Sequence, residues 1–270
     1  MSGGVSIRTA DEVALARRAG HLAADVLLMI GEHVKAGVTT EALDQLCHDY
    51  IVNVQQAVPA NIGYHGYTKT VCTSVNHVVC HGIPSDKVLK RGDIVNIDVA
   101  VIKDGWFGDC SRMYFVGEPS TLAKRLVDTT YEAMCAGILQ VRPGATLGDV
   151  GHAIQAVARR ENFSVVREYC GHGIGLIYHD EPQVMHYGRA GEGLTLKTGM
   201  IFTIEPMLNA GRAGIKEMRD GWTVVTQDHS LSAQWEHMVT VTETGFEVLT
   251  PWPEGYGAYP AIEAAAELSR

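Results

Sequence analysis

The sequence predicts an α+β fold made of two similar halves. Helical segments come in two pairs, apolar strand segments follow each pair, and matching positions in the two halves lie 107 residues apart. We therefore expect one domain over residues 1–250, with halves at about 10–117 and 118–250, and a C-terminal tail over 251–270. Two such halves packed about a pseudo-twofold axis would bring equivalent strands side by side.

The composition fits a globular protein with a sizeable core. Of the 270 residues, 46% are apolar, and the net charge of −9 argues against a dedicated nucleic-acid-binding protein. The sequence has no apolar run of membrane-spanning length and no apolar N-terminal signal, so we expect no membrane association and a cytoplasmic location. Because the six cysteines form no CxxC pair, we expect reduced packing residues rather than disulfides or a structural zinc site.

Four helices are predicted, mainly from their N-terminal capping residues. Thr9 with Glu12 three residues later matches a capping box, and Thr39 and Thr146 are candidate N-caps of later helices. Gly37 should end the first helix. The expected ranges are about 10–35, 39–54, 120–140 and 146–161. Short strands and glycine-rich turns fill most of the chain beyond the last helix.

Residues 93–116 are typical of a β-hairpin that turns at Asp104-Gly105. With a two-residue turn, the numbers of facing residues sum to 209, so Asp109 lies opposite Ala100 and diagonal to Asp98. One face of the first arm is wholly apolar, with Val95, Ile97, Val99 and Val101. The two aspartates should therefore converge on the other face.

Two carboxylates in a half-buried place should not both stay ionised without a cation between them. A divalent metal between Asp98 and Asp109 is one interpretation, and a solvated acidic patch on a surface hairpin is the other. A three-residue turn with a bulge would change the register and separate the two acids.

The repeat places a second acid beside the first. Gly37-Val38-Thr39 corresponds to Gly144-Ala145-Thr146, and the same offset of 107 carries Asp98 onto Glu205. A His-Gly-Ile element precedes the acid strand in each half, at His81 and His172. Each half therefore consists of two helices, a histidine loop and a strand that bears an acid.

Four carboxylates on apolar strands indicate a metal centre. Glu205 and Glu236 join the two aspartates, and two divalent ions would neutralise all four charges. Taken singly, each glutamate is more often a structural acid in an ion pair. His172 lies between glycines, without the spacing or the following helix of a phosphate loop, so we interpret it, with nearby His179, as a metal ligand or substrate contact.

Five strings carry a resemblance to the type I methionine aminopeptidases of the bacterial kind. They are YHGYTKTVCTSVNHVVCHGIP, GDIVNIDVAVIKDGWFGDCS, YCGHGIG, FTIEPM and SAQWEH, and the similarity runs from about residue 5 to 250. The resemblance implies a pita-bread fold of the metallopeptidase kind, with helices packed outside a curved, mainly antiparallel sheet. It implies a dinuclear site in which Asp98 binds one metal, His172 and Glu205 bind the other, and Asp109 and Glu236 bridge both.

The resemblance also implies roles in catalysis and substrate binding. His179 would polarise the scissile carbonyl, His81 would lie near the departing peptide, and Glu205 would accept and donate a proton. The methionine pocket would be formed by Tyr64, Tyr67, Cys72, Tyr178 and Trp222, and His81 and His179 would contact the substrate.

Two positions depart from the pattern of the resemblance. Asn61 stands where cysteine is expected, which alters one wall of the pocket. Cys110 stands where threonine is common, which puts in doubt a hydrogen bond to a metal carboxylate.

The expected reaction is removal of the N-terminal methionine from nascent chains and peptides, with a small second residue favoured. The start Met1-Ser2 fits this rule, so Met1 should be removable. Two divalent cations are expected as cofactors, and Co, Mn, Fe and Zn all suit the ligands. The alternatives are an Xaa-Pro peptidase of the same fold and a non-catalytic homologue that binds nascent chains or ribosomes.

We expect a monomer with an extended C-terminal segment, either docked or disordered, and a short helix at about 262–268. The basic loop with Lys87, Lys90 and Arg91 could make a transient ribosome contact, although a solvated turn is the favoured interpretation.

Overall fold

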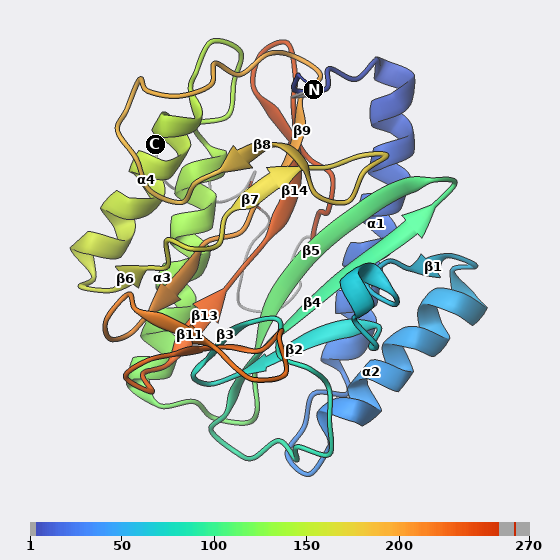
Figure 1. Ribbon diagram of the computed structural model, residues 1–270, viewed down its shortest axis with the longest axis vertical. Helices are drawn as coiled ribbons and strands as arrows, with labels where there is room; N and C mark the ends of the chain where they lie inside the picture. Colours follow the sequence, from blue (N-terminus) through green and yellow to red (C-terminus); the bar gives the residue numbers. More distant parts are fainter. Residues whose placement is uncertain (1–3, 254–261, 263–270) are drawn as a thin grey trace.

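The computed structural model describes residues 4–253 and Ile262 (Figure 1). The four predicted helices are confirmed, and two short helical turns accompany them. Their bounds are α1 Ala10–Gly31, α2 Thr40–Asp49, the π-helical turn η1 Tyr50–Val54, the 3-10 turn η2 Tyr64–Gly66, α3 Thr121–Ile138 and α4 Leu147–Arg160. In Figure 1, α1 and α2 lie on one side of the central strands, and α3 and α4 lie on the other.

The helix starts follow the predicted caps. Thr9 and Glu12 form a complete capping box at the start of α1, and the Thr39 hydroxyl accepts a hydrogen bond from the Ala42 N–H at the start of α2. Helix α1 ends before its predicted end at about 35. The chain turns there so that the Gly37 N–H can donate to the Leu89 carbonyl at 2.8 Å.

The strands form antiparallel pairs throughout the described part of the chain. The first half holds β1 Val58–Pro59, β2 Val71–Val75, β3 Val78–Cys80, β4 Ile94–Lys103 and β5 Trp106–Phe115. The second half holds β6 Ser164–Val165, β7 Gly171–Gly173, β8 Asp180–Val184, β9 Ile201–Ile204, β10 Met207–Asn209, β11 Ile215–Glu217, β12 Val224–Thr226, β13 Ser232–Gln234, β14 His237–Val241 and β15 Phe246–Val248. Their hydrogen bonds group them into sheets β1-β4-β2 with β5, β13-β10-β6, β11-β12-β3 and β15-β14-β9-β7-β8.

The predicted hairpin and its register are confirmed. Strands β4 and β5 pair so that Ala100 faces Asp109 and Asp98 faces Ser111. At the turn, Asp104 and Gly105 have φ of 52° and 82°, as a two-residue hairpin turn with a left-handed backbone requires. The two aspartates therefore project from the same face of the hairpin.

The internal repeat extends to individual backbone contacts. The hydrogen bond from Gly37 N–H to the Leu89 carbonyl has its equivalent from Gly144 N–H to the Leu196 carbonyl, at 2.8 and 3.0 Å. Both glycines have positive φ, 94° and 85°, where a side chain would strain the backbone. The matching sequence positions thus make matching contacts in the two halves.

The main apolar cluster lies between the helices and the sheets. All four valine and isoleucine side chains of the predicted apolar face of β4 are fully buried in it. The same cluster takes in Val127 of α3, Ile154 of α4 and Phe202 of β9, so both halves contribute to one core. No helix in the described part of the chain is both long enough and apolar enough to cross a membrane.

Of the C-terminal tail, the structure describes residues 251–253 and Ile262. Trp252 and Ile262 are buried against the main cluster. The helix predicted at about 262–268, apart from Ile262, and the Met1-Ser2 start lie outside the described residues.

Candidate active site and metal centre

All twelve site residues named from the sequence line one cavity of about 330 Å³. They are Tyr64, Tyr67, Cys72, His81, Asp98, Asp109, His172, Tyr178, His179, Glu205, Trp222 and Glu236. Asn61, His65 and Gly221 complete the lining. Neither lysine nor arginine occurs among these lining residues, so the carboxylates have no cationic side chain in the cavity wall.

The four acids come from both halves of the chain. Asp98 and Asp109 project from the β4–β5 hairpin, Glu205 follows β9, and Glu236 precedes β14. An isolated bridge between Ser111 and Glu236 joins the halves, with the Glu236 N–H donating to the Ser111 carbonyl at 3.2 Å. One of the contacts between the halves therefore involves an acid of the site itself.

Three of the predicted ligands are close enough to share one ion. Single ligand atoms of Asp109, His172 and Glu236 all lie within 4.8 Å of one another. His172 Nε2 lies 3.5 Å from Asp109 Oδ2 and 3.6 Å from Glu205 Oε1. The Gly173 carbonyl lies 3.1 Å from His172 Nδ1 and can only accept, so Nδ1 carries the proton and Nε2 faces the acids.

Two glycines allow the strands to close around His172. A Cβ at Gly173 would lie 2.1 Å from the Glu181 carbonyl oxygen, and one at Gly171 would lie 2.3 Å from the Thr203 carbonyl oxygen. Any side chain at these positions would push neighbouring strands apart. The close backbone approach inferred from the sequence is therefore confirmed for the loop that carries the imidazole.

The electrostatics of the acids favour bound cations. Burial raises the pKa of Asp98 and Glu236 well above its ordinary value, and the neighbouring carboxylates raise it further. Asp109 Oδ1 is buried without a hydrogen-bond partner among the described residues. For His172, burial alone would lower the pKa, but Asp109 and Glu205 outweigh it and raise the pKa above its ordinary value. Oxygen donors with a single imidazole fit divalent ions.

Glu205 is held by neighbours that the sequence did not reveal. The Thr203 hydroxyl donates to Oε1 at 2.7 Å, and Gln234 Nε2 donates to Oε2 at 3.3 Å. The Glu205 N–H donates to His186 Nε2 at 3.1 Å. Desolvation raises the pKa of Glu205 to about 7, although His172 acts to lower it. Thr203 lies two residues before Glu205, a spacing that could have suggested a shared face.

The two histidines assigned to catalysis are neutral near pH 7. Burial lowers the pKa of His81 to about 4. Desolvation, followed by the charge of His172, lowers that of His179 to about 3, although part of its ring is exposed at the cavity mouth. His179 Nδ1 lies 2.7 Å from the Tyr64 hydroxyl, which fixes the ring. His65, which the sequence reading missed, packs edge-on against Tyr64 at 4.4 Å.

Aromatic rings form another part of the cavity wall, here called the aromatic end, next to the acid end that carries the four carboxylates. Tyr67 and Trp222 meet edge to face at 4.8 Å, and Tyr64 and Tyr178 lie 4.9 Å apart. Tyr178 also stacks on Phe107 of β5 at 5.1 Å. Such a pocket suits an apolar, polarizable side chain.

The two residues that depart from the family pattern, Asn61 and Cys110, have different surroundings. Asn61 is buried in the cavity wall, where its Oδ1 accepts from the Tyr178 hydroxyl at 2.7 Å. Cys110 is fully buried in the main apolar cluster, because successive strand side chains point to opposite faces. Asn61 therefore changes the pocket, whereas Cys110 packs in the core.

Comparisons with known proteins agree with this geometry. A methionine aminopeptidase of Rickettsia prowazekii (strain Madrid E) is 56% identical over 251 residues, which cover 93% of this chain and 96% of the relative. A methionine aminopeptidase of Escherichia coli (strain K12) is 56% identical over 247 residues, which cover 91% and 94%.

Solved structures show the same fold. The crystal structure of methionine aminopeptidase from Rickettsia prowazekii, at 56% identity, matches with a TM-score of 0.90 over 91% of this chain and 99% of that chain. An X-Pro aminopeptidase from Thermotoga maritima MSB8 shares only the fold, with a TM-score of 0.70 and 22% identity over 92% of this chain and 62% of that chain. The expected pita-bread fold is confirmed. The profile of metallopeptidase family M24 matches residues 14–243, and the chain belongs to this family.

Proposed function

We propose that this protein is a methionine aminopeptidase, which hydrolyses the peptide bond after an N-terminal methionine. The observation that carries the proposal is one cavity of about 330 Å³ whose wall combines a cluster of acids and a histidine with aromatic rings. The two relatives of 56% identity are named for the same activity.

Five residues would hold two divalent cations. They are Asp98, Asp109, His172, Glu205 and Glu236, which all line the cavity, and ligand atoms of Asp109, His172 and Glu236 lie within 4.8 Å of one another. Such cations supply Lewis acidity and lower the pKa of water. The donor set suits Mn, Fe or Co as well as Zn.

The chain's own groups would position the substrate and move its protons. Glu205, which lines the cavity beside His172, would accept a proton from the attacking water and return it to the departing amine. Neutral His179 would hydrogen-bond to the scissile carbonyl oxygen, with its ring held by Tyr64. His81 would contact the peptide on the departing side.

A second, smaller cavity supports a preference for a small second residue. It measures about 230 Å³, shares His81 and Glu205 with the first cavity, and extends past Tyr169 and Cys170. Tyr169 packs edge-on against His81 at 5.3 Å, which narrows this side. Alanine or serine after the methionine would fit best.

The alternatives are less well supported. An Xaa-Pro peptidase does not require an aromatic pocket for a thioether side chain. The X-Pro aminopeptidase structure shares only the fold with this chain. A non-catalytic homologue would be expected to lack a ligand, whereas all five positions hold suitable donors here.

The deciding experiment is release of methionine from Met-Ala-Ser by the purified protein loaded with Mn²⁺ or Co²⁺. Ala-Pro peptides serve as the comparison for the Xaa-Pro alternative. We expect cleavage of the first peptide only, and its loss in Glu205→Ala. A metal-loaded protein of native fold that released no methionine would overturn the proposal.

We propose nascent chains as substrates and therefore expect a cytoplasmic location. We expect a monomer, to be checked by light scattering. The loop with Lys87, Lys90 and Arg91 is exposed, and we favour a solvated turn there. Co-sedimentation with ribosomes at low and high salt would detect a transient contact instead.

A further inference from the structure

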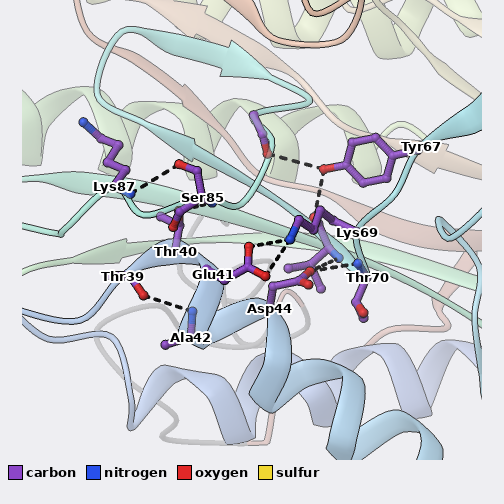
Figure 2. Close-up of polar contacts among 12 residues, drawn as sticks. Thr39, Thr40, Glu41, Ala42, Asp44, Tyr67, Lys69, Thr70, Ser85 and Lys87 are labelled. Carbon is purple, nitrogen blue, oxygen red and sulfur yellow. Dashed lines mark hydrogen bonds and ion pairs between the residues drawn. The ribbon is translucent and has the colours of Figure 1, made fainter.

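A buried carboxylate of helix α2 lies behind the aromatic pocket without reaching the cavity. Asp44 is 7% exposed, and its Oδ1 accepts hydrogen bonds from the Thr70 N–H at 2.8 Å and the Val71 N–H at 2.9 Å (Figure 2). These two residues lie between Tyr67 and Cys72, which both line the cavity. Asp44 is not among the residues that line the cavity and therefore acts on it only through others.

The carbonyl groups of the same two residues hold the pocket wall. The Val71 carbonyl accepts from the Tyr67 hydroxyl at 3.0 Å, and the Thr70 carbonyl accepts from Asn61 Nδ2 at 3.1 Å. All four backbone polar groups of Thr70 and Val71 are thus engaged, two with Asp44 and two with pocket side chains. A shift of this dipeptide would move both pocket side chains together.

Asn61 carries the connection across the pocket. Its Oδ1 accepts from the Tyr178 hydroxyl at 2.7 Å. The Tyr178 ring lies 4.2 Å from that of His179 and stacks on Phe107 at 5.1 Å. Tyr178 and Asn61 are both 7% exposed, so water does not compete for their hydrogen bond.

We propose that Asp44 is a positioning residue for the methionine pocket, acting through the Thr70-Val71 backbone and Asn61 on Tyr67 and Tyr178. The inference rests on the proposed function, because the pocket is taken to bind methionine. A carboxylate suits this place because its charge strengthens both bonds from the backbone N–H groups. The position of an apolar side chain in such a wall sets how tightly the substrate binds.

The exposed pair Glu41 and Lys69 offers a matched control. It joins the same helix to the residue before Thr70, with Lys69 Nζ 2.6 Å from Glu41 Oε1 (Figure 2). The Glu41 side chain is 49% exposed, so the ion pair contributes little. Glu41→Gln should therefore leave activity near that of the wild type.

The first test compares steady-state kinetics of the metal-loaded protein on Met-Ala-Ser. We expect Asp44→Ala to raise KM by about tenfold or more with a much smaller change in kcat, and Asp44→Asn to show a smaller rise. Calorimetry should show weaker binding of L-methionine by the same order. The proposal would be overturned if KM and the affinity for L-methionine were unchanged and kcat fell only in proportion to the folded fraction. That outcome would show a purely structural role for Asp44.

The second test asks whether Asp44 and Tyr178 act through the same series of hydrogen bonds or independently. It uses Asp44→Asn and therefore does not depend on the folding of Asp44→Ala. Tyr178→Phe removes only the hydroxyl that bonds to Asn61. Combined with Asp44→Asn, it should raise KM by clearly less than the product of the two single effects, whereas Tyr178→Phe with Glu41→Gln should give the product. Multiplicative effects in both pairs would refute the connection. If the wild-type protein failed to cleave Met-Ala-Ser, the proposed function would fail instead.

Discussion

The two ends of the cavity are built differently. Asp98 and Asp109 lie within the long strands β4 and β5, whose register fixes them, and Glu205 and Glu236 directly adjoin the ends of β9 and β14. The aromatic end comes from segments between strands, where Tyr64 lies in η2 and Tyr178 precedes β8. Those segments depend on a few side-chain hydrogen bonds, such as the one between Tyr178 and Asn61. Changes at the acid end should therefore abolish the chemistry, and changes at the aromatic end should weaken binding.

Removing Asp109, one of the proposed metal ligands, should have the largest effect. Asp109→Asn is expected to lower kcat/KM on the order of a thousandfold, because it removes a charge that would hold the cations. Elemental analysis after dialysis should show less bound metal. Asp104→Asn is the matched control, since that acid lies at the exposed hairpin turn with 54% of its side chain accessible. If Asp109→Asn kept the metal content and activity of the wild type, the acid end would not be the part of the cavity on which catalysis depends.

Metal removal should change the pH dependence of stability at the acid end. Burial and then mutual repulsion raise the pKa of Asp98 and Glu236, so the folded metal-free protein binds more protons than the unfolded chain. Its stability should fall as pH rises from the unfolded pKa of about 4 toward the raised values. Cations bind the ionised acids and should offset this loss.

Thermal unfolding with EDTA or with Mn²⁺ at pH 5.5 and pH 8 measures the effect. We expect the metal to raise Tm by several degrees more at pH 8 than at pH 5.5. An equal rise in Tm at both pH values would mean that the ionised acids do not destabilise the metal-free protein.

At the aromatic end, Trp222→Leu should raise KM for Met-Ala-Ser by about tenfold with little change in kcat, because a sulfur–ring contact is worth roughly 0.3 to 1.5 kcal/mol. Trp222 packs on Tyr67 at 4.8 Å. For a peptide that begins with norleucine, which lacks sulfur, the same substitution should raise KM by a smaller factor. A loss confined to kcat would place Trp222 with the chemistry rather than with the pocket.

The same division decides what could be predicted from the sequence. Period-2 alternation and the turn placed Asp98 and Asp109 on one face, and the offset of 107 led to Glu205, because strands obey a short-range rule. The aromatic residues came only from the resemblance, since segments between strands have no period. Asp44 could not be found, because its partners Thr70 and Val71 lie 26 and 27 residues away and offer only backbone N–H groups.

The smallest expected effect concerns the side chain that supports Glu205. The Thr203 hydroxyl donates to Glu205 and acts to lower its pKa. Thr203→Val removes this donor, so the pKa of Glu205 should rise and its ionised form should require a higher pH. The acidic side of the pH profile of kcat/KM should then shift to higher pH by less than about one unit, with near wild-type activity above pH 8.

Thr240→Val is the control for that shift. Thr240 lies on neighbouring β14, and its hydroxyl donates to the Met200 carbonyl at 3.1 Å, away from Glu205. Thr240→Val loses one buried hydrogen bond and should lose about 1 kcal/mol of stability, whereas Thr203→Val should lose more, because the Thr203 hydroxyl also accepts from the His172 N–H at 3.0 Å. Only Thr203→Val should move the pH profile, because only that hydroxyl touches the proton-carrying acid. An equal shift in both would mean that the acidic side of the profile reports stability rather than the ionisation of Glu205.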